Sequence, residues 1–181
     1  MFKKLLDKIK NPPAEASARK NFDRAYRALM RNDMGAAAKH NTAAVENFDQ
    51  MIQETEASGK EVFPRLLALA GIAYVRENRP ADAEKCFKDV RRRNDKLEEP
   101  YIYGGIALGA LGEADKAVEV WKEYYRFTGM PAIVTVLKEQ LRLFENGETD
   151  MDSVCAELSA AIHKQDRQDF RAGKEYQLLK K

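Results

Sequence analysis

The chain has 181 residues, of which 44% are hydrophobic and 33% charged, a balance typical of a globular protein rather than a disordered one. Its length suits one domain with a substantial core and is short for two. The sequence contains no apolar run of the roughly 18 residues that a membrane-spanning helix needs, so we predict no span.

An amphipathic segment, residues 1–13, opens the sequence. Phe2, Leu5 and Ile9 recur at helical spacing among lysines, and the proline pair that follows ends the pattern. Such a segment can contact a membrane surface weakly through residues 1–10, or pack against the body or a second subunit, and both interpretations stay open. Charges interrupt any signal-peptide core here, which favours a cytoplasmic protein.

The charges are distributed unevenly along the chain. Residues 1–20 carry a net charge of +4 and residues 163–181 a net charge of +3, whereas residues 21–162 carry −5, although the whole chain has only +2. Opposite charges attract over about a Debye length. We therefore expect the basic ends to be drawn either to an anionic surface or back onto the acidic body of the protein.

Helical periodicity follows the proline pair, and turn residues divide it into segments. We expect one helix over 14–31 and a longer one over 35–57, which the turn at 58–60 ends. Pro64 and Pro80 stand where prolines begin helices, because the first N–H of a helix has no intrahelical partner. No segment has a strand pattern, so the sequence predicts an all-α fold.

A repeat is the clearest signal in the sequence. Two segments, 64–97 and 98–131, come into register when the chain is offset by 34 residues, and small and large side chains then match. The matched pairs are Gly71 and Gly105, Ile72 and Ile106, Ala83 and Ala117, and Phe87 and Trp121. Glycine and alanine let two helices approach closely, and the aromatic residues fill the space between them. The pattern therefore predicts two equivalent helix pairs.

With this period and these residues, the chain resembles the tetratricopeptide repeat (TPR) family. The resemblance implies a short right-handed solenoid of antiparallel helix pairs over 14–163, with repeats at about 18–57, 64–97 and 98–131. A degenerate pair at 132–163 is expected to cap the stack. The first repeat departs from the family pattern, because Ala25 stands at the glycine position and the second helix of that repeat is long.

The resemblance also implies a binding site. In TPR arrays, the first helix of each repeat lines a concave groove. The residues expected to line the groove here are Phe22, Tyr26, Leu29, Arg65, Ala68, Ile72, Arg76, Glu99, Ile102 and Tyr103. Most are apolar, which suits a hydrophobic peptide or one face of a helix. Leu69 and Ile106 are also candidates, but either could equally belong to the core between repeats.

The C-terminal residues 164–181 are predicted to be a charged tail. Most of them are polar, with isolated apolar side chains at Phe170, Tyr176, Leu178 and Leu179. Such a segment can dock loosely or remain disordered. Both ends of the chain are therefore candidates to fill the groove.

The function that we expect is that of a scaffold or adaptor, which binds a protein or peptide partner in the apolar groove. Two alternatives stay open. Repeat arrays can stack on copies of themselves, which would make the chain a homo-oligomer. A membrane-peripheral accessory protein would use the basic segment 1–10 instead.

We find no pattern that indicates catalysis or a cofactor. Cys86 and Cys155 lie far apart in helical patterns, where a free cysteine is usually a small core residue. His40 and His163 are too few for a histidine-based metal site. We therefore predict no enzymatic activity, no cofactor and no bound metal.

The sequence does not indicate nucleic-acid binding either. The one run of arginines, Arg91–Arg93, is flanked by the acidic residues Asp89 and Asp95, which cancel much of its field. No basic face carries interleaved aromatic residues of the kind that stack on bases. We interpret the run as a solvated helix end whose cations complement the helix dipole.

Overall fold

The computed structural model describes residues 13–127, 130–174 and 176–179. All regular elements in these ranges are helical, which confirms the all-α class. The elements are α2 (Ala14–Met30), α3 (Met34–Ala57), α4 (Pro64–Arg76), α5 (Pro80–Arg93), α6 (Glu99–Ala110), α7 (Ala114–Tyr124), α8 (Pro131–Glu145), α9 (Met151–Arg171) and the 3-10 helix η1 (Gln177–Leu179). The amphipathic N-terminal segment expected at 1–13 lies outside the described residues, apart from Pro13.

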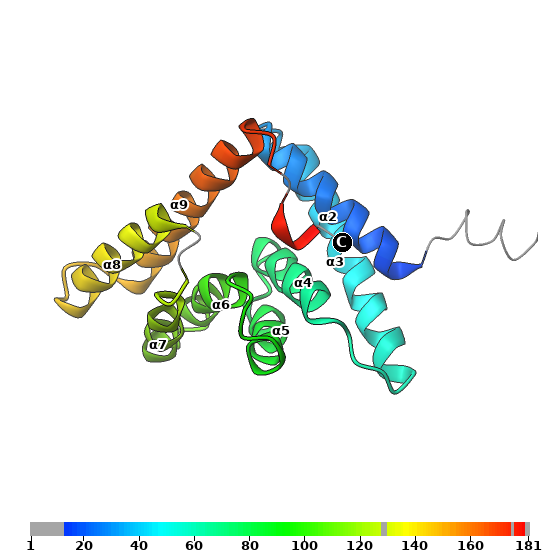
Figure 1. The fold of residues 1–181 in the computed structure, drawn as a ribbon, viewed down its shortest axis with the longest axis horizontal. Helices are drawn as coiled ribbons and strands as arrows, with labels where there is room; N and C mark the ends of the chain where they lie inside the picture. The colour runs from blue at the N-terminus through cyan, green and yellow to red at the C-terminus, as the bar shows by residue number, and fades with distance from the viewer. Residues whose placement is uncertain (1–12, 128–129, 175, 180–181) are drawn as a thin grey trace, which may run out of the picture.

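Consecutive helices form four pairs (Figure 1). The most extensive packing within the described residues joins α2 to α3, α4 to α5 and α6 to α7, and α8 packs on α9. Between pairs, α3 contacts α4, α5 contacts α6, and α7 contacts α8. The fold is thus a linear series of helix hairpins, each of which packs on the next.

The first helix of every pair ends in the same way. The residue two positions beyond the helix has a positive φ, which lets the following backbone N–H reach the carbonyl five residues earlier at 2.8–2.9 Å. The residues are Asn32 (φ 64°), Asn78 (φ 56°), Gly112 (φ 75°) and Gly147 (φ 72°). Glycine and asparagine tolerate this left-handed conformation best. The first and last pairs therefore share a local feature with the two pairs that the sequence repeat aligns.

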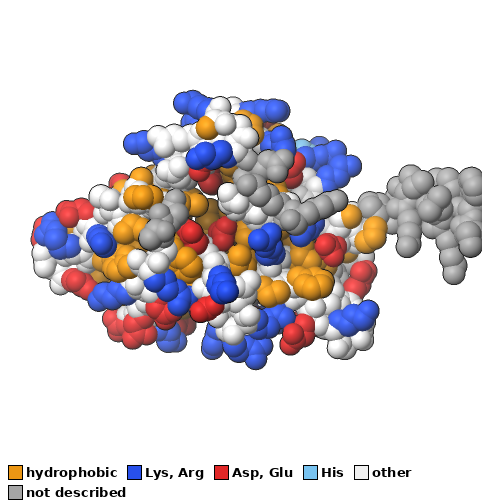
Figure 2. Space-filling model, viewed as in Figure 1, with side chains coloured by type: hydrophobic (Ala, Val, Ile, Leu, Met, Phe, Trp, Pro, Cys, Tyr) orange, Lys and Arg blue, Asp and Glu red, His pale blue; other side chains and the backbone are white. Residues whose placement is uncertain are grey.

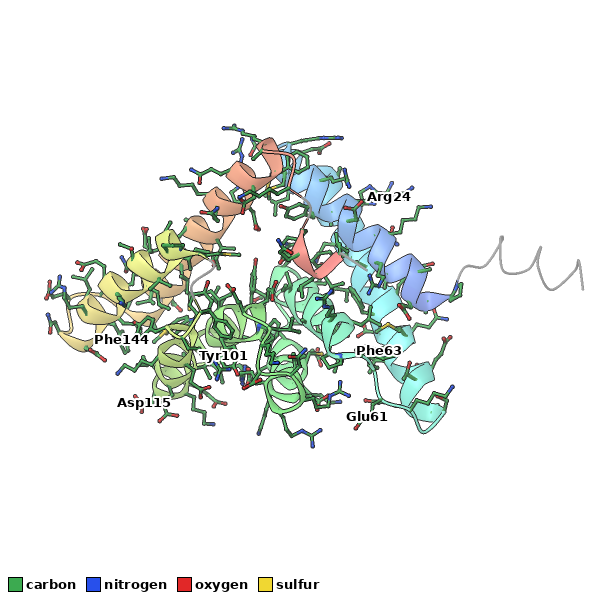
Figure 3. All side chains as sticks on the ribbon, in the orientation of Figure 1. Arg24, Glu61, Phe63, Tyr101, Asp115 and Phe144 are labelled. Atoms are coloured by element: carbon green, nitrogen blue, oxygen red, sulfur yellow. The ribbon has the colours of Figure 1, made fainter. Side chains whose placement is uncertain are left out.

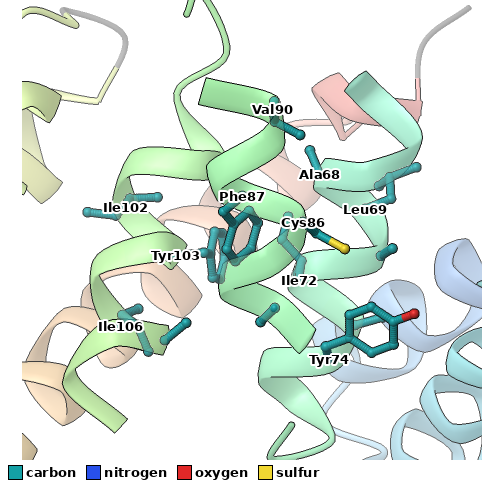
Figure 4. Close-up of a cluster of buried hydrophobic side chains, with 14 of the residues drawn as sticks. Ala68, Leu69, Ile72, Tyr74, Cys86, Phe87, Val90, Ile102, Tyr103 and Ile106 are labelled. Atoms are coloured by element: carbon teal, nitrogen blue, oxygen red, sulfur yellow. The ribbon is translucent and has the colours of Figure 1, made fainter. Parts of the chain in front are cut away.

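The matched glycines accept matched aromatic rings. A Cβ atom on Gly71 would lie 2.5 Å from the Phe87 ring, and one on Gly105 would lie 2.2 Å from the Trp121 indole nitrogen. The Trp121 Nε1–H also donates to the carbonyl oxygen of Ile102 at 3.0 Å. Figure 4 shows Phe87 packed between α4 and α6. The sequence repeat therefore corresponds to one packing arrangement that occurs twice.

A polar cluster joins the first helix pair to the second. The Tyr74 hydroxyl on α4 donates to Asp49 Oδ1 on α3 at 2.6 Å, and the Arg79 guanidinium donates to Asp49 Oδ2 at 2.7 Å. Beside it, the Asn41 amide donates to the carbonyl oxygen of Ala73 at 3.1 Å. These bonds orient the long helix α3, whose C-terminal end extends away from α4 in Figure 1.

The series of helices curves until its two ends meet. Helix α9 continues to Arg171, so the expected boundary between the last pair and the tail, at 163, falls inside this helix. Near its C-terminal end, α9 contacts α2 (Figure 1). The Phe170 ring lies 6.2 Å from the Tyr26 ring, and the Tyr26 hydroxyl donates to the carbonyl oxygen of Asp166 at 3.4 Å. Helices α2, α4, α6 and α9 therefore surround a central space.

Candidate functional site

The residues expected to line a groove face this central space to different extents. Phe22, Ala68 and Ile72 have no exposed surface, and Tyr26, Ile102 and Tyr103 are at most 8% exposed. Leu29, Arg76 and Glu99 are half-buried, and Arg65 is exposed. Leu69 and Ile106, which could have been groove or core residues, are both buried. Figure 4 shows several of these side chains within the hydrophobic core.

The chain's own C-terminal residues occupy the central space. We call residues 176–179 the tail segment. The Tyr176 ring lies 4.8 Å from the Tyr26 ring and 5.9 Å from the Phe22 ring, centroid to centroid. Leu178 is 1% exposed, and η1 contacts α4. Burial of these predicted groove residues is therefore due in part to the tail segment, which Figure 1 shows between α2, α4 and α9.

The tail segment rests in a seat formed by Phe22 and Tyr26 on α2 and by Arg76 on α4, and Arg76 is the cation of this seat. The Arg76 guanidinium, on α4, sits 5.1 Å from the centroid of the Phe22 ring, a geometry that allows a cation–π interaction. Arg76 also acts electrostatically on the carboxyl group of Asp166 on α9 and on the hydroxyl of Tyr176. Arg76 therefore places one positive charge beside groups from α2, from α9 and from the tail segment.

A cavity of about 60 Å³ with a mostly apolar lining remains beside Tyr176, and this volume is enough for ordered water. Tyrosines, apolar side chains and carboxyl groups line it. The carboxyl groups belong to Glu98, Glu99, Asp166 and Asp169. On the face drawn in Figure 2, acidic side chains lie near the centre, between patches of hydrophobic ones. The tail segment therefore fills the central space incompletely, and it covers acidic groups as well as apolar ones.

Two of these acidic groups hold their protons unusually tightly. Burial raises the pKa of Glu99 to about 7, and the neighbouring Glu98 adds to the effect. Burial likewise raises the pKa of Asp166 to about 6, although Arg76 opposes this shift. Asp166 is only 8% exposed, and burial to this extent is rare for an aspartate. Both carboxyl groups therefore change charge close to neutral pH.

The forces that hold the tail segment are weak compared with those of the core. Burial of one tyrosine or leucine side chain contributes about 1.5–3 kcal/mol. Ordering each residue costs about 1–2 kcal/mol in backbone entropy. Tyr176, Leu178 and the half-buried Leu179 are the apolar anchors of the tail segment, which has four residues. The gain and the cost are of similar size, so we expect a small net docking free energy.

One flank of the tail segment is open to solvent. A surface groove of about 630 Å³ runs between α2 and the C-terminal residues. Its apolar lining includes Phe170, Tyr176 and Leu179, and its polar rim includes Arg19, Lys20, Arg27 and Lys174. An approaching peptide can therefore contact the flank of the tail segment before that segment leaves its seat.

A second hollow, of about 500 Å³, lies between α3, α4 and α5. Its apolar floor includes Ile52, Val62 and Leu67, and its rim carries charges of both signs. Several of these charges are already paired, because Arg93 bridges to Glu61 and Asp89 at 3.0 and 3.1 Å. Near it, Phe63 is 73% exposed and points outward in Figure 3. No segment of the described chain occupies this hollow.

The thiols and histidines do not form a reactive site in the part of the chain that the structure describes. Burial raises the pKa of the Cys86 thiol to about 12 and that of Cys155 to about 11, so both stay protonated at neutral pH. Burial also lowers the pKa of His163. The described residues contain no group of three or more histidine, cysteine or acidic side chains able to hold a metal ion.

Comparison with known proteins adds no identity to this geometry. No family model matches the chain, and neither a curated protein nor a solved structure is similar to it. Among the described helices, none has both the length and the apolar character needed to cross a membrane. Over the residues that the structure describes, the fold is an all-helical series of four packed hairpins.

Proposed function

We propose that this chain is a non-catalytic adaptor built as a TPR-type right-handed solenoid, and that its concave face binds an apolar segment of a partner protein. Two repeated features support the architecture. The Gly71–Phe87 contact recurs 34 residues later as Gly105–Trp121. The left-handed residue that ends the first helix recurs in all four pairs.

One observation carries the functional proposal: the concave face already holds a short apolar segment, residues 176–179. A surface that orders an aromatic ring and a leucine from its own chain has the shape and chemistry to do the same for another chain. Ring contacts of this kind contribute about 0.5–1.5 kcal/mol beyond the area buried. The seat formed by Phe22, Tyr26 and Arg76 has the aromatic and arginine character of binding hot spots.

The proposed groove is smaller than the set of residues expected from the sequence. Ala68 and Ile72 have no exposed surface and pack in the core, so we leave them outside the contact surface. Tyr26, Ile102 and Tyr103 border the cavity beside the tail segment, so we keep them in the contact surface of the groove. We assign Glu99 and Arg76 to the orientation of the bound segment, because they are half-buried groups that both act electrostatically on Tyr103.

A random peptide library tests this proposal and does not require the partner to be identified first. The target is the full-length double variant Tyr176→Ser/Leu178→Ser, which removes the two main apolar anchors of the tail segment. We expect selection of short apolar peptides whose binding weakens at least tenfold when Arg76→Glu is added. The matched control is Arg24→Glu, since Arg24 is exposed on the outer side of α2 (Figure 3).

Two results of that selection would count against an adaptor. The first is a failure to enrich any peptide family on a target that circular dichroism shows to be folded. The second is enrichment of peptides that bind the Arg76→Glu and Arg24→Glu proteins equally well, because these peptides would bind outside the groove.

A further inference from the structure

We propose that the tail segment is an intramolecular ligand that competes with the partner, and that the partner segment has the tail's own pattern: a basic residue, then an aromatic residue two positions later, then a leucine two positions after that. This inference rests on the proposed adaptor function. It adds the chemistry of the partner and the way in which access to the groove is regulated.

The pattern follows from which tail side chains the groove holds. Tyr176 packs on Tyr26 and Phe22, and Leu178 is 1% exposed, whereas Gln177 between them is exposed. Tyr176 and Leu178 therefore provide the main contacts with the groove, and the half-buried Leu179 adds a smaller one. Because the Gln177 side chain is exposed at the edge of the cavity, we expect its position in a partner to accept many residue types.

The basic position has a defined contact as well. Lys174 Nζ donates to Asp169 Oδ1 on α9 at 2.8 Å. Asp169 is in turn bonded by Gln165 at 3.2 Å, which holds its carboxylate in place. A partner with lysine or arginine two positions before its aromatic residue can replace this ion pair. The hydrogen bond from Lys174 lowers the pKa of Asp169, so this carboxyl group is ionised beside the tail and favours a segment of positive charge.

Covalent attachment makes the tail segment a strong competitor despite its weak anchors. Helix α9 ends at Arg171, only a few residues before Tyr176, so the effective concentration of the tail at the groove is high. A partner binds only to the fraction of molecules whose tail has left the seat. If the tail is docked in about 90% of molecules, the apparent affinity for the partner is about tenfold below the intrinsic one.

The open flank gives the partner a route into the groove. The rim residues Arg19 and Lys20 and the apolar residue Phe170 remain accessible while the tail segment is docked. A segment that first contacts this flank can then exchange with the tail one anchor at a time. Regulation by the tail thus requires no rearrangement of the helix pairs.

Fluorescence anisotropy with a labelled synthetic peptide, AGKEYQLLKK, tests the proposal. This peptide copies residues 172–181, and the control peptide AGKESQSLKK lacks both anchors. The proteins are the full chain, the full-length Tyr176→Ser/Leu178→Ser variant and the Gln177→Ser variant as a matched control. We expect the peptide to bind the double variant about tenfold or more tightly than the full chain. Gln177→Ser should behave as the full chain does, and the control peptide should not bind.

A measurement on the unaltered chain covers the case in which the double variant does not fold. Hydrogen exchange of residues 172–181 should accelerate when an excess of the isotopically heavy AGKEYQLLKK peptide is added, because the peptide displaces the tail. The AGKESQSLKK peptide should leave the exchange unchanged.

Three results overturn the inference. Equal affinity of the peptide for the full chain and the double variant shows that the tail does not compete. A concentration-dependent dimer of the full chain that the double variant does not form places the tail in a second copy. If library peptides bind the groove but AGKEYQLLKK does not, the adaptor proposal stands and the tail pattern is wrong.

Discussion

The rings of Tyr26 and Tyr176 lie 4.8 Å apart, centroid to centroid, although 150 residues separate them in the chain. This contact joins the first helix pair to the last described residues and closes the curve of helices. It also converts a concave face, which the repeat pattern alone leaves open, into one that is occupied.

We first predict that Gly71→Ala destabilises the protein by about 1–3 kcal/mol, because the new methyl group overpacks a filled core. A Cβ atom there would lie 2.5–2.6 Å from Phe87 ring atoms, and the ring has no free space around it because it is fully buried. Gly35→Ala is the control, since its nearest atom is 3.9 Å away and the site lies in the first turn of α3. Urea denaturation of both variants measures the difference. Equal free energies of unfolding would contradict the close approach of α4 and α5.

The repeats were predictable because their local and long-range signals agree. Pro64, Pro80 and the left-handed Gly112 set helix ends through the backbone alone. Gly71 and Phe87 then form a contact between neighbouring helices only 16 residues apart in the sequence. Such short-range information is present in any single repeat and occurs twice here.

The contact between α2 and α9, which closes the curved series of helices, was not predictable in the same way. It depends on the length of α9, which continues through the polar residues 164–171. Charged residues such as Asp166 are expected at the surface, yet this one is buried against Tyr26. Tyr176 and Leu178 stood out in the sequence as isolated apolar residues of the tail. Only the packed structure shows which face they contact.

A second prediction separates the tail segment from the core. Leu178→Ala should remove the hydrogen-exchange protection of the tail but lower the global free energy of unfolding by less than about 1 kcal/mol, because the loss cannot exceed the small docking free energy. Phe87→Ala, at an equally buried core site, should cost about 3–5 kcal/mol. A loss for Leu178→Ala of the same size as that for Phe87→Ala would show that the tail belongs to the cooperative core.

The third prediction concerns pH. The pKa of Glu99 is raised from 4.5 to about 7 and that of Asp166 from 3.8 to about 6, so the folded protein, in which both groups line the cavity beside the tail segment, binds more protons than the unfolded chain. Stability from these groups is therefore fully present below about pH 4 and is lost as pH rises through 6–7. Hydrogen exchange of the tail should be slower at pH 5.5 than at pH 8, after correction for intrinsic rates.

Charge removal provides the control for this pH effect. The groups that face Glu99 and Asp166 include the acids Glu98 and Asp169 and the cation Arg76 on α4. Glu99→Gln removes one titrating group and should flatten the pH dependence between 5.5 and 8. Glu139→Gln, at an exposed carboxylate on α8 that pairs with an arginine, should keep the full dependence. The same pH profile in both variants would exclude Glu99 as its source.

The fourth prediction concerns the polar cluster between the first two helix pairs. Tyr74→Phe deletes the 2.6 Å hydrogen bond to the ionised Asp49 and should cost about 1.5–3 kcal/mol. Burial alone would raise the pKa of Asp49, but the hydrogen bonds from Arg79 and Tyr74 outweigh it and lower this pKa. The stabilisation is lost once the carboxylate is protonated, so the cost of Tyr74→Phe should shrink as pH falls. Tyr125→Phe, at a half-buried tyrosine whose ring packs beside Lys138, should cost less than about 0.5 kcal/mol. Thermal denaturation at pH 7 and pH 3 compares them.

Photo-crosslinking from position 176 tests the occupied groove most directly. With benzoylphenylalanine in place of Tyr176, we expect intramolecular crosslinks to Phe22 or Tyr26 on α2, or to Tyr103 on α6, in the full-length protein. An excess of the AGKEYQLLKK peptide should then suppress these crosslinks, whereas AGKESQSLKK should not. Crosslinks only to helices away from the seat, such as α3, α5 or α7, or crosslinks that persist unchanged under an excess of the first peptide, would contradict a groove held by its own displaceable tail.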